Sequence, residues 1–266
     1  MSDDRVLPLK GVHNFRDFGN YAVSGGGRVR PRVLWRSGQH HGATDDDLGR
    51  IAELGLAHIF DLRTGRERST HPCRRPKGFA GQVYYTADPD LQVRSIQQAP
   101  HLAAGHAARG RNVAGARESM RGNYRTIAFR PQLVDSMRQL LVVLAEDGRP
   151  TLVNCMAGKD RTGIAVATVQ LALGVHEDDA IADYVLTKTA GDPAARIAAG
   201  VETISAMAGD MSPEVLEVLM GVEAEYIETA FASMRERHGS IDCYLRDVLG
   251  ADDALRARLR ERLIEH

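Results

Sequence analysis

The chain has 266 residues, of which 43% are hydrophobic and 26% charged, a composition that excludes a wholly disordered chain, a collagen-like repeat and a coiled coil. Its 34 Lys and Arg residues nearly balance its 35 Asp and Glu residues, so no overall charge favours nucleic acid or a membrane surface as a partner. Three cysteines make no disulfide framework, and no run of about 18 apolar residues predicts a membrane span.

Short apolar runs predict strands in the first half of the chain, over 32–36, 58–62 and 82–86. A helix is expected between the first two, because Thr44 can cap it and three aspartates follow at its positive end. Asp61 and Arg63 close the second strand, on the side of the sheet where α/β proteins build their sites.

The segment 90–122 breaks this pattern. It is rich in Ala, Gly, Gln and Arg, and its five arginines stand against two acidic residues. A segment of this kind buries little, so we expect a mobile lid that recruits anionic substrates. The alternative is a solvated loop whose charges only confer solubility.

Helices dominate the second half. We expect a helix over 131–146 with one apolar face, a strand over 151–154 and a helix that ends near 173. Further helices are expected over 177–190, 194–207, 213–220, 222–238 and 252–265. Strands and helices that alternate and then give way to helices predict one α/β domain over 1–266, with an added C-terminal helical layer.

The strongest local signal follows the strand 151–154. Cys155 comes directly after it, and Arg161 follows six positions later, where a helix begins. Loop amides and a helix N-terminus make an anion site, and a guanidinium fits two phosphate oxygens. A thiol in such a field readily becomes a thiolate nucleophile. The other loop positions expected to contact the anion are Met156, Ala157, Gly158, Lys159, Thr162 and Gly163.

This Cys-x5-Arg loop resembles the phosphate loop of the cysteine-dependent phosphatases. The string Gly158-Lys159-Asp160-Arg161-Thr162-Gly163 is similar to that of a bacterial branch, tyrosine phosphatases of broad specificity that also act on phosphoinositides. Further matches span about residues 11 to 250, at 14–19, 34–38, 61–63 with Glu67, 183–184, 239–241 and 244–245.

The resemblance implies a cysteine-phosphatase-like sheet flanked by helices and a metal-independent reaction with no cofactor. Cys155 would attack phosphorus, Arg161 would bind its oxygens, Asp160 would protonate the leaving group, and Lys159 would add a second cation. The implied partners are a phosphorylated protein or a phosphoinositide, with vanadate-type anions bound in the loop. Asp160 as a loop-stabilising carboxylate is the alternative, and Asp88 or Asp90 are weaker candidates for the acid.

One residue departs from the family. Asn154 stands before the cysteine, where the family usually has His, and it brings no charge to help hold the thiolate. A phosphate-binding module that has lost useful catalysis is therefore the second hypothesis. A sulfur-transfer enzyme that forms a persulfide on Cys155 is the third.

Several residues have a structural interpretation beside the functional one. Asp61 and Arg63 are as readily explained by an ion pair with Glu67 or Arg36 as by a catalytic or substrate-binding role. We expect Asn14, Arg16 and Asp17 of the N-terminal motif only to tie the N-terminus to the body of the protein. The pair His40 and His41 is expected on the surface, and Tyr184 and Tyr244 are expected in the core. With no secretory signal visible, a cytoplasmic location is expected, and export without such a signal stays open.

Overall fold

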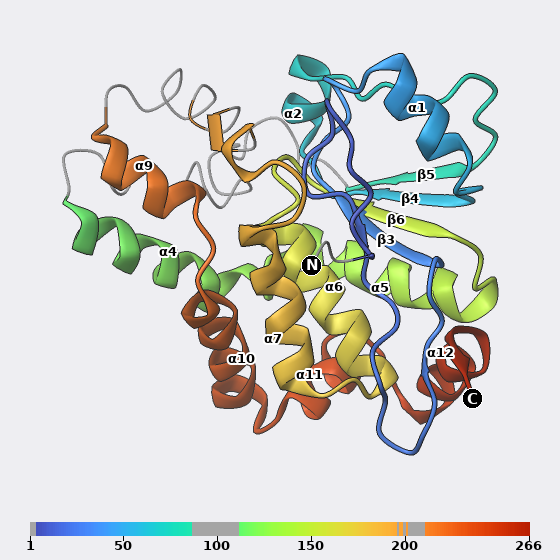
Figure 1. Ribbon diagram of the computed structural model, residues 1–266. Coiled ribbons are helices and arrows are strands. Elements are labelled where there is room, and N and C mark those ends of the chain that lie inside the picture. The colour runs from blue at the N-terminus through green and yellow to red at the C-terminus, as the bar shows by residue number, and fades with distance from the viewer. Residues whose placement is uncertain (1–3, 87–111, 196, 199–200, 202–210) are drawn as a thin grey trace.

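The computed structural model describes residues 4–86, 112–195, 197–198, 201 and 211–266, and a five-stranded sheet lies at its centre (Figure 1). The strands stand in the order β1-β3-β6-β4-β5. β3, β6, β4 and β5 run parallel, and β1 pairs antiparallel with β3 at one edge. In that order the bounds are Arg16–Asp17, Leu34–Ser37, Thr151–Asn154, His58–Asp61 and Gln82–Tyr85.

The register of the central strands positions the site. Asn154, the last residue of β6, is paired with Ser37 on one side and with Asp61 on the other. Three parallel strands therefore end at one level, and the segments that leave them meet at the same edge of the sheet. This is the edge at which open α/β sheets bind their ligands.

Helices cover both faces of the sheet (Figure 1). In chain order, the helices before β6 are α1, α2, α4 and α5, over Asp45–Ala52, Gly65–Thr70, Val113–Ile127 and Pro131–Glu146. After it come α6, α7 and the 3-10 helix η2, over Asp160–Leu173, Glu177–Val185 and Leu186–Lys188. The last four are α9, α10, α11 and α12, over Pro213–Met220, Ala224–His238, Ile241–Asp247 and Asp253–Leu263.

Alternate side chains of the central strands enter two separate cores. Ile59 and Leu152 pack into a small core that α1 covers. Their neighbours Phe60 and Val153 point to the opposite face and join the large core under α5 and α6. Successive side chains of a strand point to opposite faces of the sheet. Because both faces are buried here, apolar residues follow one another without interruption along these strands.

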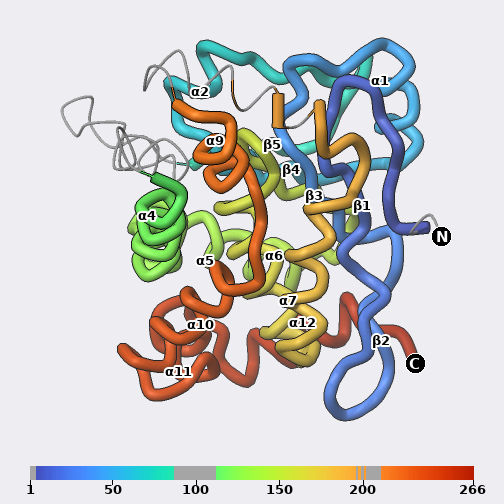
Figure 2. Tube along the Cα trace, turned by 60° about the vertical axis from the view of Figure 1, so that its left-hand side comes forward, coloured from blue at the N-terminus to red at the C-terminus, as the bar shows by residue number. Residues whose placement is uncertain are grey.

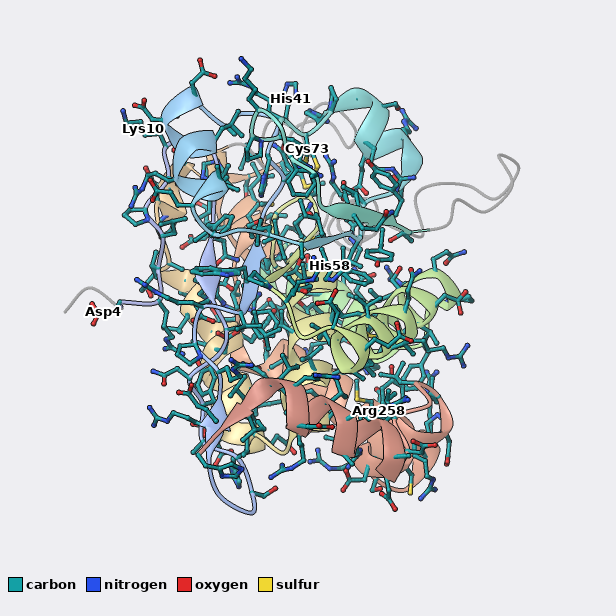
Figure 3. The ribbon with its side chains drawn as sticks, turned by 90° about the vertical axis from the view of Figure 1, so that its right-hand side faces the viewer. Asp4, Lys10, His41, His58, Cys73 and Arg258 are labelled. Carbon is teal, nitrogen blue, oxygen red and sulfur yellow. The ribbon has the colours of Figure 1, made fainter. Side chains whose placement is uncertain are left out.

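The C-terminal helices form a further layer beyond α6. Figure 2 shows α10 and α11 at the end of the molecule away from α1, with α9 beside α4. Figure 3 shows α12, labelled at Arg258, at the end opposite His41. A small second sheet pairs β2 (Arg28–Val29) with β7 (Ile264–Glu265). The predicted α/β sheet with an added C-terminal helical layer is thus confirmed.

Some expected elements differ from those observed. Residues 113–122, assigned from sequence to a segment that buries little, belong to α4, whose Ala116 and Met120 have no exposed surface. The rest of the expected lid, from 90 to 111, lies outside the described residues, as do Asp88 and most of the predicted helix 194–207. α2 and α11 were not expected; both are short, at six and seven residues, so periodicity has little to act on.

The histidine pair also differs from expectation. His41 is exposed, but His40 is buried, with its Nε2 2.9 Å from the Ser37 hydroxyl and its ring against Phe15. The assignment of His40 to the surface was therefore wrong. Within the described ranges, no helix combines the length and apolar character needed to cross a bilayer.

Candidate active site

The loop after β6 is fastened to the rest of the molecule through Gly158. Its carbonyl accepts hydrogen bonds from Asn14 Nδ2 at 2.7 Å and from Arg36 Nη2 at 3.1 Å. Gly158 has a φ of 66°, and a Cβ added there would lie 2.5 Å from the Ser37 carbonyl carbon and oxygen. Any larger residue would therefore push the loop off β3.

The neighbouring loop positions are also tightly packed. The Met156 carbonyl accepts from the Gln39 amide at 3.0 Å, and Ala157 packs against the large core. A Cβ on Gly163 would lie 2.7 Å from the Tyr184 ring, so this glycine lets the first turn of α6 approach α7. The loop carbonyls of Met156 and Gly158 are thus used by outside donors, an arrangement that suits amides turned inward to an anion.

Cys155 is the first residue after β6 and is only 3% exposed. Thr162, in the first turn of α6, is fully buried, and its hydroxyl has no hydrogen-bond partner within the described part of the chain. A buried hydroxyl without a partner costs free energy. A thiolate acceptor would remove that cost, so this hydroxyl suits a hydrogen bond to the sulfur of Cys155.

Arg161 is held by a carboxylate in a fork-to-fork geometry. Its Nη1 and Nη2 each lie 2.7 Å from an oxygen of Glu67, and Nη1 also donates to the Leu62 carbonyl. Burial would lower the pKa of Arg161, but Glu67 and then the charge of Cys155 raise it above its usual value. Nε is buried and has no partner among the described residues, so this edge of the guanidinium remains for an oxyanion.

Glu67 owes its position to the start of α2. It is the third residue of a capping box, in which its Oε2 accepts from the Thr64 amide at 2.8 Å and its own amide donates to the Thr64 hydroxyl. The same carboxylate thus caps a helix and orients Arg161. The sequence motif included Glu67 without showing which arginine it binds.

Asp160 begins α6 and is 3% exposed. Its Oδ1 accepts a 2.6 Å hydrogen bond from the Tyr124 hydroxyl, which lies 2.6 Å from the Tyr184 hydroxyl in turn. Burial, and next the negative charge of Asp160, raise the pKa of Tyr124 well above its usual value. The phenol therefore stays a donor, and within the described chain both close polar contacts of Asp160 fall on Oδ1, not on Oδ2.

Lys159 has a different place from the one its charge suggested. Its side chain is fully buried, and Nζ donates to the carbonyls of Leu219 at 2.6 Å and Gly221 at 3.1 Å. Nζ also lies 3.4 Å from Asp160 Oδ1. In this structure the ammonium thus fastens the end of α9 to the loop.

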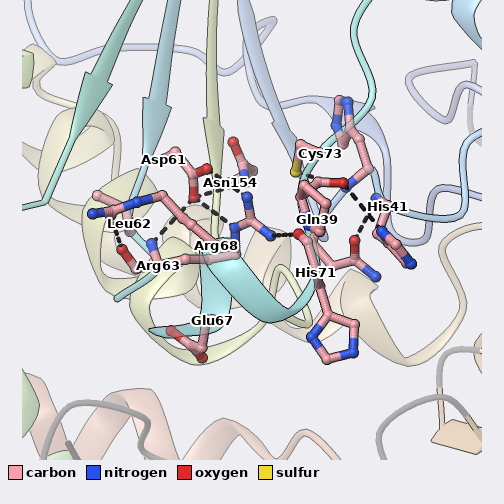
Figure 4. A network of polar contacts seen from close by, with 12 residues as sticks. Gln39, His41, Asp61, Leu62, Arg63, Glu67, Arg68, His71, Cys73 and Asn154 are labelled. Carbon is pink, nitrogen blue, oxygen red and sulfur yellow. Dashed lines mark hydrogen bonds and ion pairs between the residues drawn. The ribbon is translucent and has the colours of Figure 1, made fainter. Parts of the chain in front are cut away.

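Asp61 and Arg63 are partners of each other (Figure 4). Arg63 Nε and Nη2 lie 2.8 and 2.7 Å from the two oxygens of Asp61, and Nη1 donates to the His71 carbonyl. Asn154 Nδ2 lies 3.3 Å from Asp61 Oδ1, while Asn154 Oδ1 is buried without a partner in the described ranges. An ion pair was anticipated, but not this pairing, because Glu67 binds Arg161.

The other anticipated partner, Arg36, belongs to a second buried cluster. Its Nη1 lies 2.6 Å from Asp183, which is also 3.5 Å from Arg16 Nε. Burial opposes the ionised form of Asp183, but Arg16 and Arg36 outweigh it and lower the pKa of this carboxyl. Arg16 also donates to Asn14, so the N-terminal motif does tie the chain to the body, and it does so at the phosphate-loop carbonyl of Gly158.

Sequence reasoning missed Tyr124 altogether. It lies 36 residues from Asp160 and 60 from Tyr184, so no spacing rule connects them. Tyr184 and Tyr244 are buried, as expected. Within the described chain, no group of three or more His, Cys, Asp or Glu side chains is placed to hold a metal ion.

Comparison with known proteins agrees with this geometry. A family model described as the tyrosine phosphatase family matches residues 7–265. The chain is 31% identical over 251 residues to a protein of Cupriavidus necator named as a tyrosine-protein phosphatase, covering 93% of this chain and 85% of that one. It is also 31% identical over 285 residues to the triple specificity protein phosphatase PtpB of Mycobacterium tuberculosis, covering 97% of this chain and 99% of that one. The chain is therefore a phosphatase that belongs to the tyrosine phosphatase family.

Proposed function

We propose that the protein hydrolyses phosphate monoesters through a covalent intermediate on Cys155, without a metal. The single observation that carries this proposal is the pairing of Arg161 with Glu67, which leaves the buried Nε edge of the guanidinium beside the cysteine loop. That edge and the loop amides would hold the equatorial phosphate oxygens and balance their charge, as preorganised donors do in a water-poor site.

The first step forms the bond from sulfur to phosphorus and breaks the bond from phosphorus to the leaving oxygen. The leaving oxygen takes a proton from Asp160, while the Thr162 hydroxyl, which has no other partner among the described residues, would donate a hydrogen bond to the sulfur. In the second step a water attacks phosphorus and gives its proton back to Asp160, and the bond from phosphorus to sulfur breaks. Tyr124 holds Oδ1, so Oδ2 would carry the proton in both steps.

The substrate range that we propose is phosphotyrosine first, with phosphoserine, phosphothreonine and phosphoinositides as further substrates. The name of the mycobacterial relative, which gives that protein triple specificity, supports a range wider than phosphotyrosine. Lys159, Asp61 and Arg63 would support the loop from behind in this scheme, because their charged groups are bonded to protein atoms.

The test is aryl phosphate hydrolysis in EDTA from pH 5 to 8, with Cys155→Ser beside the wild type. The matched control is Cys243→Ser, a partly buried cysteine of α11. Turnover that Cys155→Ser abolishes and Cys243→Ser retains supports the proposal, and turnover that survives in Cys155→Ser contradicts it.

The second candidate is a phosphate-binding module with little catalysis. The observation that favours it is Asn154, an uncharged residue before the cysteine whose Nδ2 contacts Asp61 and whose Oδ1 has no partner in the described residues. Tight vanadate binding together with no turnover in the wild type would favour this candidate over the first.

A further inference from the structure

A cavity lies between α1 and the segment 75–81 that leads into β5 (Figure 1). Its volume is about 460 Å³, and small-molecule sites in proteins measure roughly 300–1,000 Å³. No residue of the loop from Cys155 to Gly163 lines it, so the cavity is separate from the candidate active site. A ligand bound here would therefore leave the phosphate loop free.

One part of the cavity wall is apolar. Ile51, Leu56 and Ile59 line it, and all three belong to the small core that α1 covers. Phe79, from the segment before β5, also lines the cavity and packs against the same core. An apolar wall favours a ligand with an apolar body, because binding removes the surface of both from water.

Among the described residues, three cations line the cavity, and two of them have no counter-charge there. Lys77 is exposed and makes no ion pair in that part of the chain. Arg75 is half-buried; its Nη1 donates to the Arg74 carbonyl at 3.2 Å, while its Nε and Nη2 make no hydrogen bond in the same part. The third cation, Arg149, is paired with Asp147. Since no described Asp or Glu lines the cavity, its charge complements an anion.

His40 also lines the cavity, and one of its ring nitrogens lacks a partner. The residue is 1% exposed, and Nδ1 makes no hydrogen bond within the described chain. Nε2 lies 2.9 Å from the Ser37 hydroxyl, which can accept a hydrogen bond from Nε2 or donate one to it. In the second case Nδ1 carries the proton. An oxygen atom that reaches Nδ1 would then remove the cost of an unpaired buried polar group.

We propose that this cavity binds a free carboxylate that carries an apolar chain of about eight carbons. Such a chain fits the volume, since a group the size of water occupies about 30 Å³ in a liquid. The chain lies against Ile51, Ile59 and Phe79, and the carboxylate lies against Arg75 and Lys77. Its two oxygens share a plane, which matches the planar fork of a guanidinium. This binding site does not depend on the phosphatase function proposed above.

Binding of octanoate to the full chain tests the site, with Trp35 as an internal reporter. Trp35 is the only tryptophan of the protein and packs in the same small core as the apolar wall of the cavity. Calorimetry and Trp35 fluorescence should therefore give the same affinity. Octanol has the same chain length without the charge, and it should bind at least about tenfold more weakly. Butanoate should also bind at least about tenfold more weakly, because four fewer CH₂ groups leave water.

Removing the two unpaired cations should remove the preference for octanoate over octanol. In the double variant Arg75→Gln/Lys77→Gln we expect the two ligands to bind with a ratio of about one. The matched control is Lys10→Gln/Arg258→Gln, which changes the net charge equally at two exposed residues outside the cavity (Figure 3). This control should keep the ratio of the wild type. Thermal unfolding of both double variants should give the Tm of the wild type, because none of the four side chains is in a core.

Saturating vanadate distinguishes the cavity from the phosphate loop. Octanoate bound in the cavity should keep its affinity when vanadate is present. Displacement of octanoate by vanadate overturns the proposal, because the carboxylate then occupies the loop. So does the absence of both heat and a fluorescence change, equal binding of octanoate and octanol, or a preference that Arg75→Gln/Lys77→Gln leaves intact. Failure of the proposed function looks different: the wild type then hydrolyses no aryl phosphate, whether or not octanoate binds.

Discussion

Two buried carboxylates beside the phosphate loop differ in what surrounds them. Asp183 lies between Arg16 and Arg36, two permanent cations, with its side chain fully buried. Asp160 lies against the Tyr124 phenol, with the Lys159 ammonium 3.4 Å away. A carboxylate between two guanidinium groups is fixed in its ionised form. Asp160 is contacted through one oxygen only, which leaves its other oxygen available, so the first carboxylate acts as a structural tie and the second fits the acid role proposed above.

The largest expected effect is on stability, from Asp183→Asn. The substitution leaves Arg16 and Arg36 buried without their carboxylate, and breaking a buried pair in this way costs about 3–5 kcal/mol. Urea unfolding at neutral pH measures it. Asp242→Asn is the control, because that carboxylate is exposed and pairs with Arg256 at the surface, where a loss below about 1 kcal/mol is expected. Equal losses in the two variants would contradict the role of Asp183.

Asp160→Asn should show a different pattern, a loss of rate with a smaller loss of stability, because Asn keeps an oxygen for the Tyr124 hydroxyl and Lys159 keeps its two carbonyl partners. We expect kcat to fall about 10²- to 10³-fold for aryl phosphates with poor leaving groups, because these need a proton from the acid. Aryl phosphates with good leaving groups are the internal control and should lose far less. A uniform loss across the series would mean that Asp160 stabilises the loop and is not the acid.

The pH dependence of stability distinguishes His40 from Asp183, because these two groups change the free energy of unfolding in different pH ranges. Burial first, and then Arg75 and Arg63, lower the pKa of His40 from 6.5 to about 3, so the folded protein keeps it neutral where the unfolded chain binds a proton. The free energy of unfolding is therefore unaffected by His40 above pH 6.5 and decreases as the pH falls towards 3. Between pH 6.5 and 5 this decrease amounts to about 2 kcal/mol.

His40→Gln should flatten the unfolding free energy over that range of pH. His176→Gln, at an exposed histidine, is the control and should leave the slope as it is. A slope that persists in His40→Gln would assign the loss to other groups. Asp183 should add to the slope of unfolding free energy against pH only at lower pH. Its pKa is lowered in the folded protein, so its stabilisation is present at neutral pH and is lost only when the pH falls below the usual carboxyl range.

The smallest expected effect comes from Tyr124→Phe, which removes one hydroxyl. Losing the hydrogen bond that orients Asp160 should lower kcat for poor leaving groups by about tenfold or less, since such a bond contributes about 1 kcal/mol. Tyr244→Phe is matched to it, because that buried hydroxyl also donates a 2.6 Å bond, to the Ala128 carbonyl. Both variants should lose similar stability, and only Tyr124→Phe should lose rate.

The contrast between the two carboxylates also shows what a sequence reveals. The loop from Cys155 to Gly163, the strand β6 before it, the strands on both sides of β6 in the sheet and the helix over 131–146 could be predicted. Each follows from local spacing and composition. The partners of the charged groups could not. Lys159 reaches a carbonyl 60 residues away and Arg161 a carboxylate 94 residues away, so only the folded chain decides which charge meets which.

The short helix α2 links these contacts to local motion. It has no buried residue, so its stability depends on the capping box of Thr64 and Glu67 and on the ion pair between Glu67 and Arg161. An oxyanion in the loop draws on the same guanidinium and thereby changes the pull on Glu67. The amide hydrogens of α2 should consequently exchange with solvent at a rate that changes when an anion binds in the loop, so exchange at this helix reports substrate binding.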